Sequence, residues 1–333
     1  MSASEILTGD VYARLPDIEP GSCRCCVTSP PYWGLRDYGV DGQLGLEATP
    51  DEYVARMVAV FRLVRDALAD DGTLWLNLGD SYIAGQGGRQ SAAGEMPKST
   101  LKMSKGPKKR SDVDVSGWST RDVTVKTTPT AACGLKPKDL TGIPWMVAFA
   151  LRADGWYLRS DIIWSKPNPM PESVRDRPTK AHEYVFLLSK GPRYYWDQDA
   201  VREAATEANR FNGSRGVDTA KTGANGDRND GGRTAKGWES SGRNVRTVWE
   251  IATQPYNGAH FATMPPRLAD TCIKAGSAVG DLVLDPFAGA GTTGLVARRL
   301  QRRFVGVELN PEYAEMARRR IESDAPLFNR GTP

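Results

Sequence analysis

The stretch that decides the fold is Leu282-Val283-Leu284-Asp285-Pro286-Phe287-Ala288-Gly289-Ala290-Gly291-Thr292-Thr293-Gly294. It predicts an apolar strand over 282–284, a glycine-rich turn and a helix over 292–300. A second strand over 304–307 and a helix over 311–321 follow. Strands that alternate with helices are typical of a doubly wound, mostly parallel sheet. The sequence therefore predicts an α/β fold.

The rest of the chain carries further elements of the same kind. A helix begins at Pro50, after a capping threonine, and is expected to end near Asp71. The pattern predicts further helices over 144–153 and 265–275, and strands over 24–28, 73–78, 157–164 and 183–189. Two polar segments, 82–138 and 209–246, interrupt this alternation and are longer than ordinary connections.

The glycine-rich turn has the features of a cofactor loop. Gly289 and Gly291 permit a tight turn and close approach of the backbone to a ligand. Glu308 ends the next strand, about twenty positions on, where a carboxylate can accept hydrogen bonds from ribose hydroxyls. No Gly-Lys-Ser/Thr follows to hold phosphates. Asp285 suits an ammonium group better than a pyrophosphate, so S-adenosylmethionine is the expected cofactor.

A second run, Thr28-Ser29-Pro30-Pro31-Tyr32-Trp33, follows the strand over 24–28. An amino group on an aromatic base is a poor nucleophile because its lone pair is delocalised into the ring. The Ser29 hydroxyl and the Pro30 carbonyl could accept both amino hydrogens and free that lone pair, and Tyr32 could stack on the base. A base inside a duplex cannot reach such a pocket unless it is flipped out. By itself the run also fits a proline-rich turn with core aromatics.

Composition narrows the function classes. The chain has 333 residues, 40% of them hydrophobic, and a net charge of +4, but residues 98–138 concentrate ten Lys and Arg. Such a block suits a phosphate backbone or a solvated loop. No apolar run is long enough to cross a bilayer and residues 1–10 lack a signal-peptide pattern, so we expect a cytoplasmic protein without membrane contact.

The cysteines do not predict a metal site. Cys23, Cys25 and Cys26 fall in a stretch that reads as a buried strand, and no second Cys pair or His pair follows at ligand spacing. His182-Glu183 lacks the second histidine of a zincin helix. We expect small buried thiols and no metal.

Taken together, the two runs resemble those of the amino-directed DNA methyltransferases, in the permuted group whose catalytic tetrapeptide precedes the cofactor motif. Five other segments resemble family motifs in the family's order, and they are Leu7–Asp10, Asp71–Asn77, Trp164–Pro169, His182–Leu187 and His260–Pro265. The resemblance implies a Rossmann-like fold, S-adenosylmethionine as cofactor and double-stranded DNA as substrate. It implies catalysis by Ser29, Pro30, Pro31 and Tyr32. It implies cofactor binding by Asp10, Phe261, Asp285, Phe287, Gly289, Gly291, Thr292 and Glu308.

The resemblance also implies a division of the chain and a choice of base. Catalytic segments 1–81 and 141–193 enclose a basic insertion, 82–140, and are followed by a target-recognition region, 194–256, a cofactor half, 257–325, and a tail, 326–333. Serine at the first position of the tetrapeptide favours cytosine N4 over adenine N6, which stays open. The absence of a Pro-Cys dipeptide argues against cytosine-C5 chemistry.

Two more distant alternatives are weighed against these. A protein glutamine methyltransferase would have asparagine at the start of the clamp and the clamp after the cofactor loop. A non-catalytic DNA-binding module would have damage in one of the two runs. A homodimer, a cognate restriction endonuclease, and a bacterial or phage-encoded origin are further expectations from the resemblance.

Overall fold

The computed structural model describes residues 4–35, 37, 39–83, 134–204, 242–254 and 263–324. In chain order its elements are β1 (Ser4–Thr8), α1 (Val11–Arg14), the 3-10 turn η1 (Leu15–Asp17), β2 (Cys23–Thr28), α2 (Pro50–Ala67), β3 (Leu68–Leu78), α3 (Ile143–Ala153), β4 (Tyr157–Ser165), β5 (His182–Ser189), the 3-10 turn η2 (Asp199–Val201), β6 (Val248–Glu250), α5 (Pro266–Gly276), β7 (Leu282–Asp285), α6 (Thr292–Arg299), β8 (Arg303–Glu308) and α7 (Pro311–Ser323). Most of the basic insertion, most of 209–246 and the residue Phe261 lie outside the described residues.

The described strands form one eight-stranded sheet in the order β1-β8-β7-β2-β3-β5-β4-β6. Neighbouring strands are parallel except where β5 runs antiparallel to β3 and β4. The mostly parallel sheet expected from the alternation of strands and helices is therefore confirmed.

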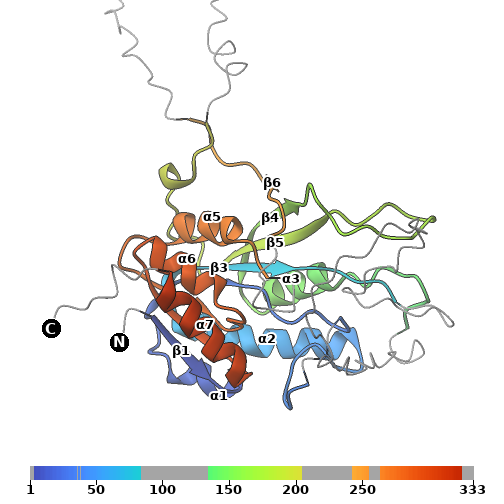
Figure 1. Cartoon of the computed structure of the whole chain (residues 1–333), viewed down its shortest axis with the longest axis horizontal. Coiled ribbons are helices and arrows are strands. Elements are labelled where there is room, and N and C mark those ends of the chain that lie inside the picture. The colour runs from blue at the N-terminus through green and yellow to red at the C-terminus, as the bar shows by residue number, and fades with distance from the viewer. Residues whose placement is uncertain are drawn as a thin grey trace, which may run out of the picture.

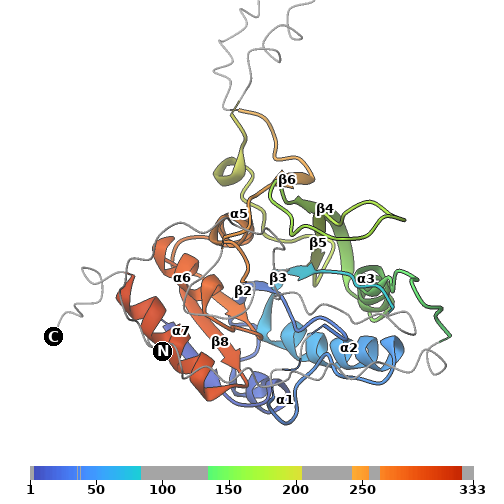
Figure 2. The same ribbon diagram turned by 45° about the vertical axis from the view of Figure 1, so that its right-hand side comes forward.

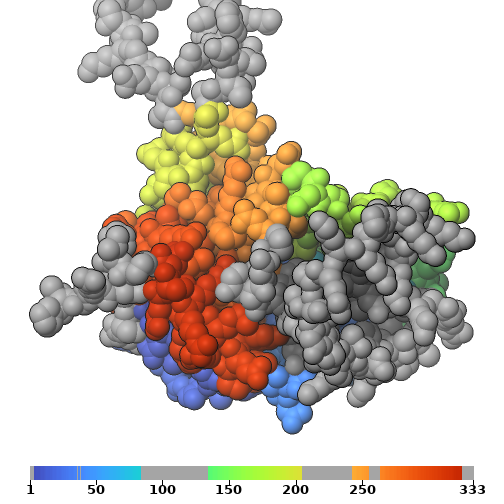
Figure 3. Space-filling view, in the orientation of Figure 1, coloured from blue at the N-terminus to red at the C-terminus, as the bar shows by residue number. Residues whose placement is uncertain are grey.

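Helices cover both faces of the sheet (Figures 1 and 2). α1, α2 and α3 pack on one face, against side chains such as Cys26 and Leu284. α5, α6 and α7 pack on the other face, against Cys25 and Val283. Successive strand residues point to opposite faces, so the continuous apolar runs of β2 and β7 fill both cores. The C-terminal part of the chain, which includes α6 and α7 and is coloured orange to red, forms much of the surface seen in Figure 3.

Helix α2 begins as expected and ends earlier. The Thr49 hydroxyl accepts from the Glu52 amide at 3.2 Å, and Pro50 occupies the first turn. The helix ends at Ala67 rather than near Asp71, because Leu68 already pairs with Cys23 in the sheet. Leu68 is fully buried there. The free energy gained by burying Leu68 in the sheet is greater than the gain from extending the helix to Asp71, although the helical sequence pattern continues past Leu68.

The cysteines of β2 behave as small apolar residues, as expected. Cys23, Cys25 and Cys26 are fully buried and free. Burial raises the pKa of Cys23 to about 11 and that of Cys25 to about 12, so both stay protonated at neutral pH. Among the described residues, no group of three or more His, Cys, Asp or Glu side chains could hold a metal ion. None of the described helices is long and apolar enough to cross a membrane.

Candidate active site

The two sequence runs meet at one edge of the sheet. β2 pairs in parallel with β7, with Cys26 opposite Leu284, so both strands end side by side. Beyond them, the Thr28 hydroxyl donates to Asp285 Oδ1 at 2.7 Å. In doubly wound sheets ligands bind outside the carboxyl ends of the strands. The expected common location of the two runs is confirmed.

The Asp285 carboxylate connects the two runs by hydrogen bonds. Its side chain is only 4% exposed. Oδ1 also accepts from the Phe287 amide at 3.0 Å, and Oδ2 accepts from the Thr293 hydroxyl at 2.7 Å. Burial raises the pKa of Asp285, while the two threonine hydrogen bonds act in the opposite direction. The carboxylate is thus engaged by three protein donors that hold the loop in shape.

The glycine-rich loop keeps its backbone open. Gly289 and Gly291 have positive φ angles of 50° and 74°, which favour glycine. A Cβ on Gly291 would lie 2.9 Å from the Cβ of Ala317 in α7, whereas a Cβ on Gly289 would meet no side chain within 4 Å. Gly291 therefore serves helix packing and Gly289 leaves free space beside the loop. The buried Thr292 is held by Arg320 Nη1, which donates to its hydroxyl at 3.0 Å.

Glu308 lies directly beside this loop. Its Oε2 accepts from the Gly289 amide at 2.8 Å and its Oε1 from the Asn310 amide at 2.9 Å. Each carboxylate oxygen keeps a further lone pair for a ligand hydroxyl. Burial raises the pKa of Glu308, opposed by these amide hydrogen bonds.

Asp10 follows β1, the strand next to β8. The Gly9 amide donates to the Glu308 carbonyl at 2.9 Å, which places the start of α1 beside the end of β8. Asp10 Oδ1 caps α1 by accepting from the Tyr12 amide at 2.8 Å. Phe287 is partly exposed in the loop. Phe261 lies outside the described residues, so its position is not assigned.

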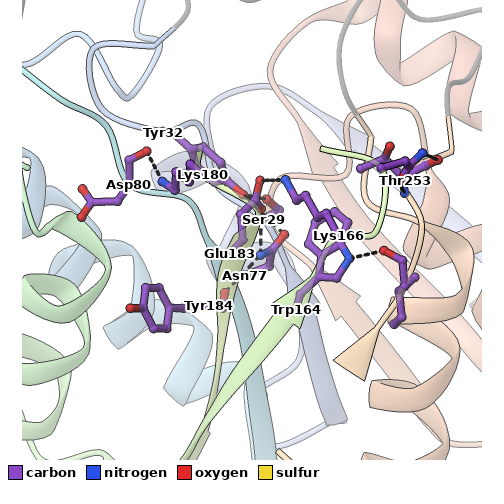
Figure 4. Close-up of polar contacts among 12 residues, drawn as sticks. Ser29, Tyr32, Asn77, Asp80, Trp164, Lys166, Lys180, Glu183, Tyr184 and Thr253 are labelled. Carbon is purple, nitrogen blue, oxygen red and sulfur yellow. Dashed lines mark hydrogen bonds and ion pairs between the residues drawn. The ribbon is translucent and has the colours of Figure 1, made fainter. Parts of the chain in front are cut away.

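The Ser29-to-Tyr32 run forms the other half of the site. Pro30 is buried, while Ser29 and Tyr32 are partly exposed. The Pro31 carbonyl accepts from the Tyr53 hydroxyl of α2 at 2.9 Å, which holds the turn against the helix. The Ser29 hydroxyl donates to the Tyr32 hydroxyl at 3.2 Å. Figure 4 shows the side chains of Ser29 and Tyr32 close to those of Asn77, Lys166 and Glu183.

Sequence reasoning did not identify Glu183, Asn77 or Lys166 as site residues. Tyr32 donates to Glu183 Oε2 at 2.7 Å, and Asn77 Nδ2 donates to the same oxygen at 3.1 Å. Lys166 donates to Glu183 Oε1, and its ammonium lies 4.4 Å from the centre of the Trp164 ring. Burial and the nearby Glu183 carboxylate raise the pKa of Tyr32 well above its usual value. The family-like segments Trp164–Pro169 and His182–Leu187 were the available signal.

A mostly parallel, doubly wound sheet with a glycine-rich loop and an acidic strand end is a Rossmann-like fold that can hold a nucleoside cofactor. Comparison of this chain with known protein families, sequences and structures agrees with this fold and identifies the family. A family model described as DNA methylase, of the N6/N4 type, matches residues 23–319. This chain belongs to that family and is an S-adenosylmethionine-dependent DNA methyltransferase.

Several characterised relatives cover nearly the whole chain. The Type II methyltransferase M.Cfr9I of Citrobacter freundii is 43% identical over 97% of this chain and 89% of its own. The Type II methyltransferase M.SmaI of Serratia marcescens is 44% identical over 96% of this chain and 91% of its own.

Solved structures share the fold at lower identity. The PvuII DNA methyltransferase, described as cytosine-N4-specific, superposes with a TM-score of 0.60 at 19% identity, over 99% of this chain and 93% of its own. A Thermus thermophilus protein assigned as a DNA modification methylase, crystallised with S-adenosyl-L-methionine, gives 0.58 at 22% identity, over 98% and 96%. These matches confirm the expected fold class.

Proposed function

We propose that this enzyme transfers a methyl group to N4 of a cytosine that is flipped out of double-stranded DNA at a specific site. The observation that carries the proposal is the Ser29 hydroxyl at the end of β2, beside the cofactor loop at the end of β7. Serine at this position favours cytosine over adenine in the family that the sequence resembles. The fold shared with the cytosine-N4-specific PvuII enzyme is consistent with this choice.

In this proposal Ser29, Pro30, Pro31 and Tyr32 act on the base. The Ser29 hydroxyl and the Pro30 carbonyl accept the two amino hydrogens, which localises the nitrogen lone pair. The partly exposed Tyr32 ring stacks on the flipped base. Pro31 fixes the turn through its carbonyl, which Tyr53 holds. Catalysis consists of positioning and electrostatic support, without a covalent enzyme intermediate.

The residues around the glycine-rich loop fit a phosphate-free nucleoside cofactor. We assign the ribose hydroxyls to Glu308, whose oxygens each keep a lone pair, and the close backbone approach to Gly289, which has open space where a Cβ would lie. Asp285 contributes by fixing the loop, since its oxygens are already engaged. Asp10, Phe261, Phe287, Gly291 and Thr292 complete the proposed cofactor site. When bound, S-adenosylmethionine supplies the methyl group.

The remaining expectations are part of the same proposal. The order of the clamp before the loop supports placement in the permuted group. Residues 194–256 are assigned to target recognition and the basic insertion to DNA contact. Because M.Cfr9I and M.SmaI are Type II methyltransferases of bacteria, we propose a cytoplasmic protein, bacterial or phage-encoded, that acts with a cognate restriction endonuclease. A homodimer is the proposed oligomeric state.

The test is expression in a methylation-deficient bacterium, followed by mass spectrometry of nucleosides from digested DNA. N4-methylcytosine above the vector control is the expected result. Detection of N6-methyladenine alone would overturn the choice of base. Detection of neither methylated nucleoside above the vector control would overturn the whole proposal. The variant Ser29→Ala should abolish methylation with cofactor affinity nearly unchanged. A loss of cofactor affinity as large as that of Asp285→Ala would show that Ser29 is structural.

A further inference from the structure

Glu183, on β5, is the centre of a small hydrogen-bonded cluster beside the Ser29-to-Tyr32 run (Figure 4). Its side chain is 14% exposed. One carboxylate oxygen accepts from Lys166, and the other accepts from Tyr32 at 2.7 Å and Asn77 at 3.1 Å. Each of these three partners is a donor, as an ionised carboxylate requires.

The contact lengths decide where the Tyr32 proton goes. The Tyr32 hydroxyl has one proton and lies 2.7 Å from the Glu183 carboxylate, 3.2 Å from the Ser29 hydroxyl and 3.4 Å from Asn77 Oδ1. Hydrogen bonds to a charged acceptor are the shorter and stronger ones. Tyr32 therefore donates to Glu183, and its oxygen is left to accept from Ser29.

This direction determines what Ser29 presents to the substrate. A serine hydroxyl can donate or accept, depending on how it rotates. With its proton committed to Tyr32, the Ser29 oxygen offers only lone pairs to the site. The amino group of the target base has only hydrogens to offer at this point, because its lone pair must face the methyl group. The base therefore needs an acceptor here and not a donor.

We infer that Glu183 sets the direction of the Ser29–Tyr32 hydrogen bonds and so makes the Ser29 hydroxyl an obligate acceptor for the target amine. Glu183 is a positioning residue that acts through its hydrogen bond with Tyr32. The Lys166 ammonium balances the negative charge of Glu183 through an ion pair with the other carboxylate oxygen, Oε1. The inference rests on the proposed function, because it concerns how Ser29 performs the role assigned there.

The kinetic test is a double-mutant cycle with Glu183→Gln and Tyr32→Phe. Glutamine keeps the size of Glu183 but can turn its amide donor toward Tyr32. Phenylalanine keeps the stacking ring and removes the link. In single-turnover transfer of a tritiated methyl group to duplex DNA, each variant should be at least about tenfold slower, equivalent to about 1.4 kcal/mol of activation free energy. Dissociation constants for cofactor and DNA should change less than about twofold.

The double variant should be no slower than the slower single variant, because both changes break the same chain. Multiplying losses would overturn the inference, as would a Glu183→Gln rate within threefold of the unmodified enzyme. Glu315→Gln is the matched control, since Glu315 on α7 forms its ion pairs with Arg318 and Arg319 and none with the residues that join Ser29, Tyr32 and Glu183. It should keep the full rate.

A second measurement does not depend on activity. In protein labelled with ¹³C at tyrosine Cζ, the Tyr32 signal is assigned by its loss in Tyr32→Phe. The signal should move in Glu183→Gln and stay in place in Glu315→Gln, because only the first change removes the carboxylate that accepts the Tyr32 proton. An unmoved signal would overturn the inference. Absence of methylated DNA from the unmodified enzyme would instead overturn the proposed function and leave this measurement standing.

Discussion

Gly79 gives a sharp test of the Tyr32 position. This residue follows β3 and lies against the Tyr32 ring. A Cβ at Gly79 would be 2.5 Å from Tyr32 Cε2, 3.0 Å from Cδ2 and 3.3 Å from Cζ. Carbon atoms in contact normally lie about 3.5–4.0 Å apart, so in Gly79→Ala the ring must retreat by about 1 Å. Gly79 is not among the glycines with positive φ, so alanine brings no backbone strain.

The magnitude follows from that displacement. A misplacement of about 1 Å in a catalytic group costs about 10²-fold in rate, or about 2.7 kcal/mol of activation free energy. Overpacking should lower the free energy of unfolding by about 1–3 kcal/mol. Cofactor affinity should hold, because the contacts of Glu308 and Gly289 lie on β8 and the loop after β7.

Single-turnover methyl transfer and calorimetric cofactor binding measure the two effects separately. Gly191→Ala is the matched control, since its added Cβ would meet no atom closer than 3.7 Å. Transfer by Gly79→Ala within about threefold of the unmodified rate would refute the assigned position of Tyr32. A loss of cofactor affinity as large as the loss of rate would also refute it.

Three further outcomes follow from buried groups. Asp285→Ala leaves three hydrogen-bond donors without their acceptor, at a cost of about 1–3 kcal/mol each. The free energy of unfolding in urea should therefore fall by about 3 kcal/mol or more, and Thr293→Val should lower it by less. Burial raises the pKa of Glu308 above its ordinary 4.5, and ribose hydroxyls donate to the ionised carboxylate. Cofactor affinity measured by calorimetry should therefore fall as the pH drops through that raised pKa. The affinity of Glu308→Gln should lack this pH dependence. The fifth cysteine of the chain, Cys133, lies outside the described residues and is replaced by serine for this test. In the Cys133→Ser variant, no thiol should react with Ellman's reagent at pH 8 until urea exposes Cys23, Cys25, Cys26 and Cys272, since burial raises the pKa of all four.

Much of the fold could be predicted because its signals are local. The cap at Thr49, the apolar strand before Asp285 and the helix after Gly291 each depend on neighbouring residues, and all three are confirmed. The end of α2 depends on the pairing of Leu68 with Cys23, which no local pattern contains. β6 has three residues and forms by pairing with β4, so its sequence alone carries little signal.

The part of the site that depends on local sequence could also be predicted, and the part that depends on distant contacts could not. Ser29 and Asp285 stand out because each follows a recognisable strand within a distinctive run. Glu183 does not, because its contact with Tyr32 spans 151 positions and depends on the antiparallel placement of β5 beside β3. Local patterns give the ends of strands, whereas the order of strands in the sheet decides which ends meet.

That distinction explains why a clamp near the start of the chain and a loop near its end can form one site. The Thr28–Asp285 hydrogen bond joins residues 257 positions apart, yet β2 and β7 are immediate neighbours in the sheet. Parallel neighbours present their carboxyl ends at the same edge whichever strand comes first in the chain. Reversing the order of the two halves therefore changes the connections and leaves the chemistry in place. Because the buried Asp285 carboxylate is hydrogen-bonded to both the clamp and the loop, a change that breaks these hydrogen bonds should impair cofactor binding and methyl transfer together.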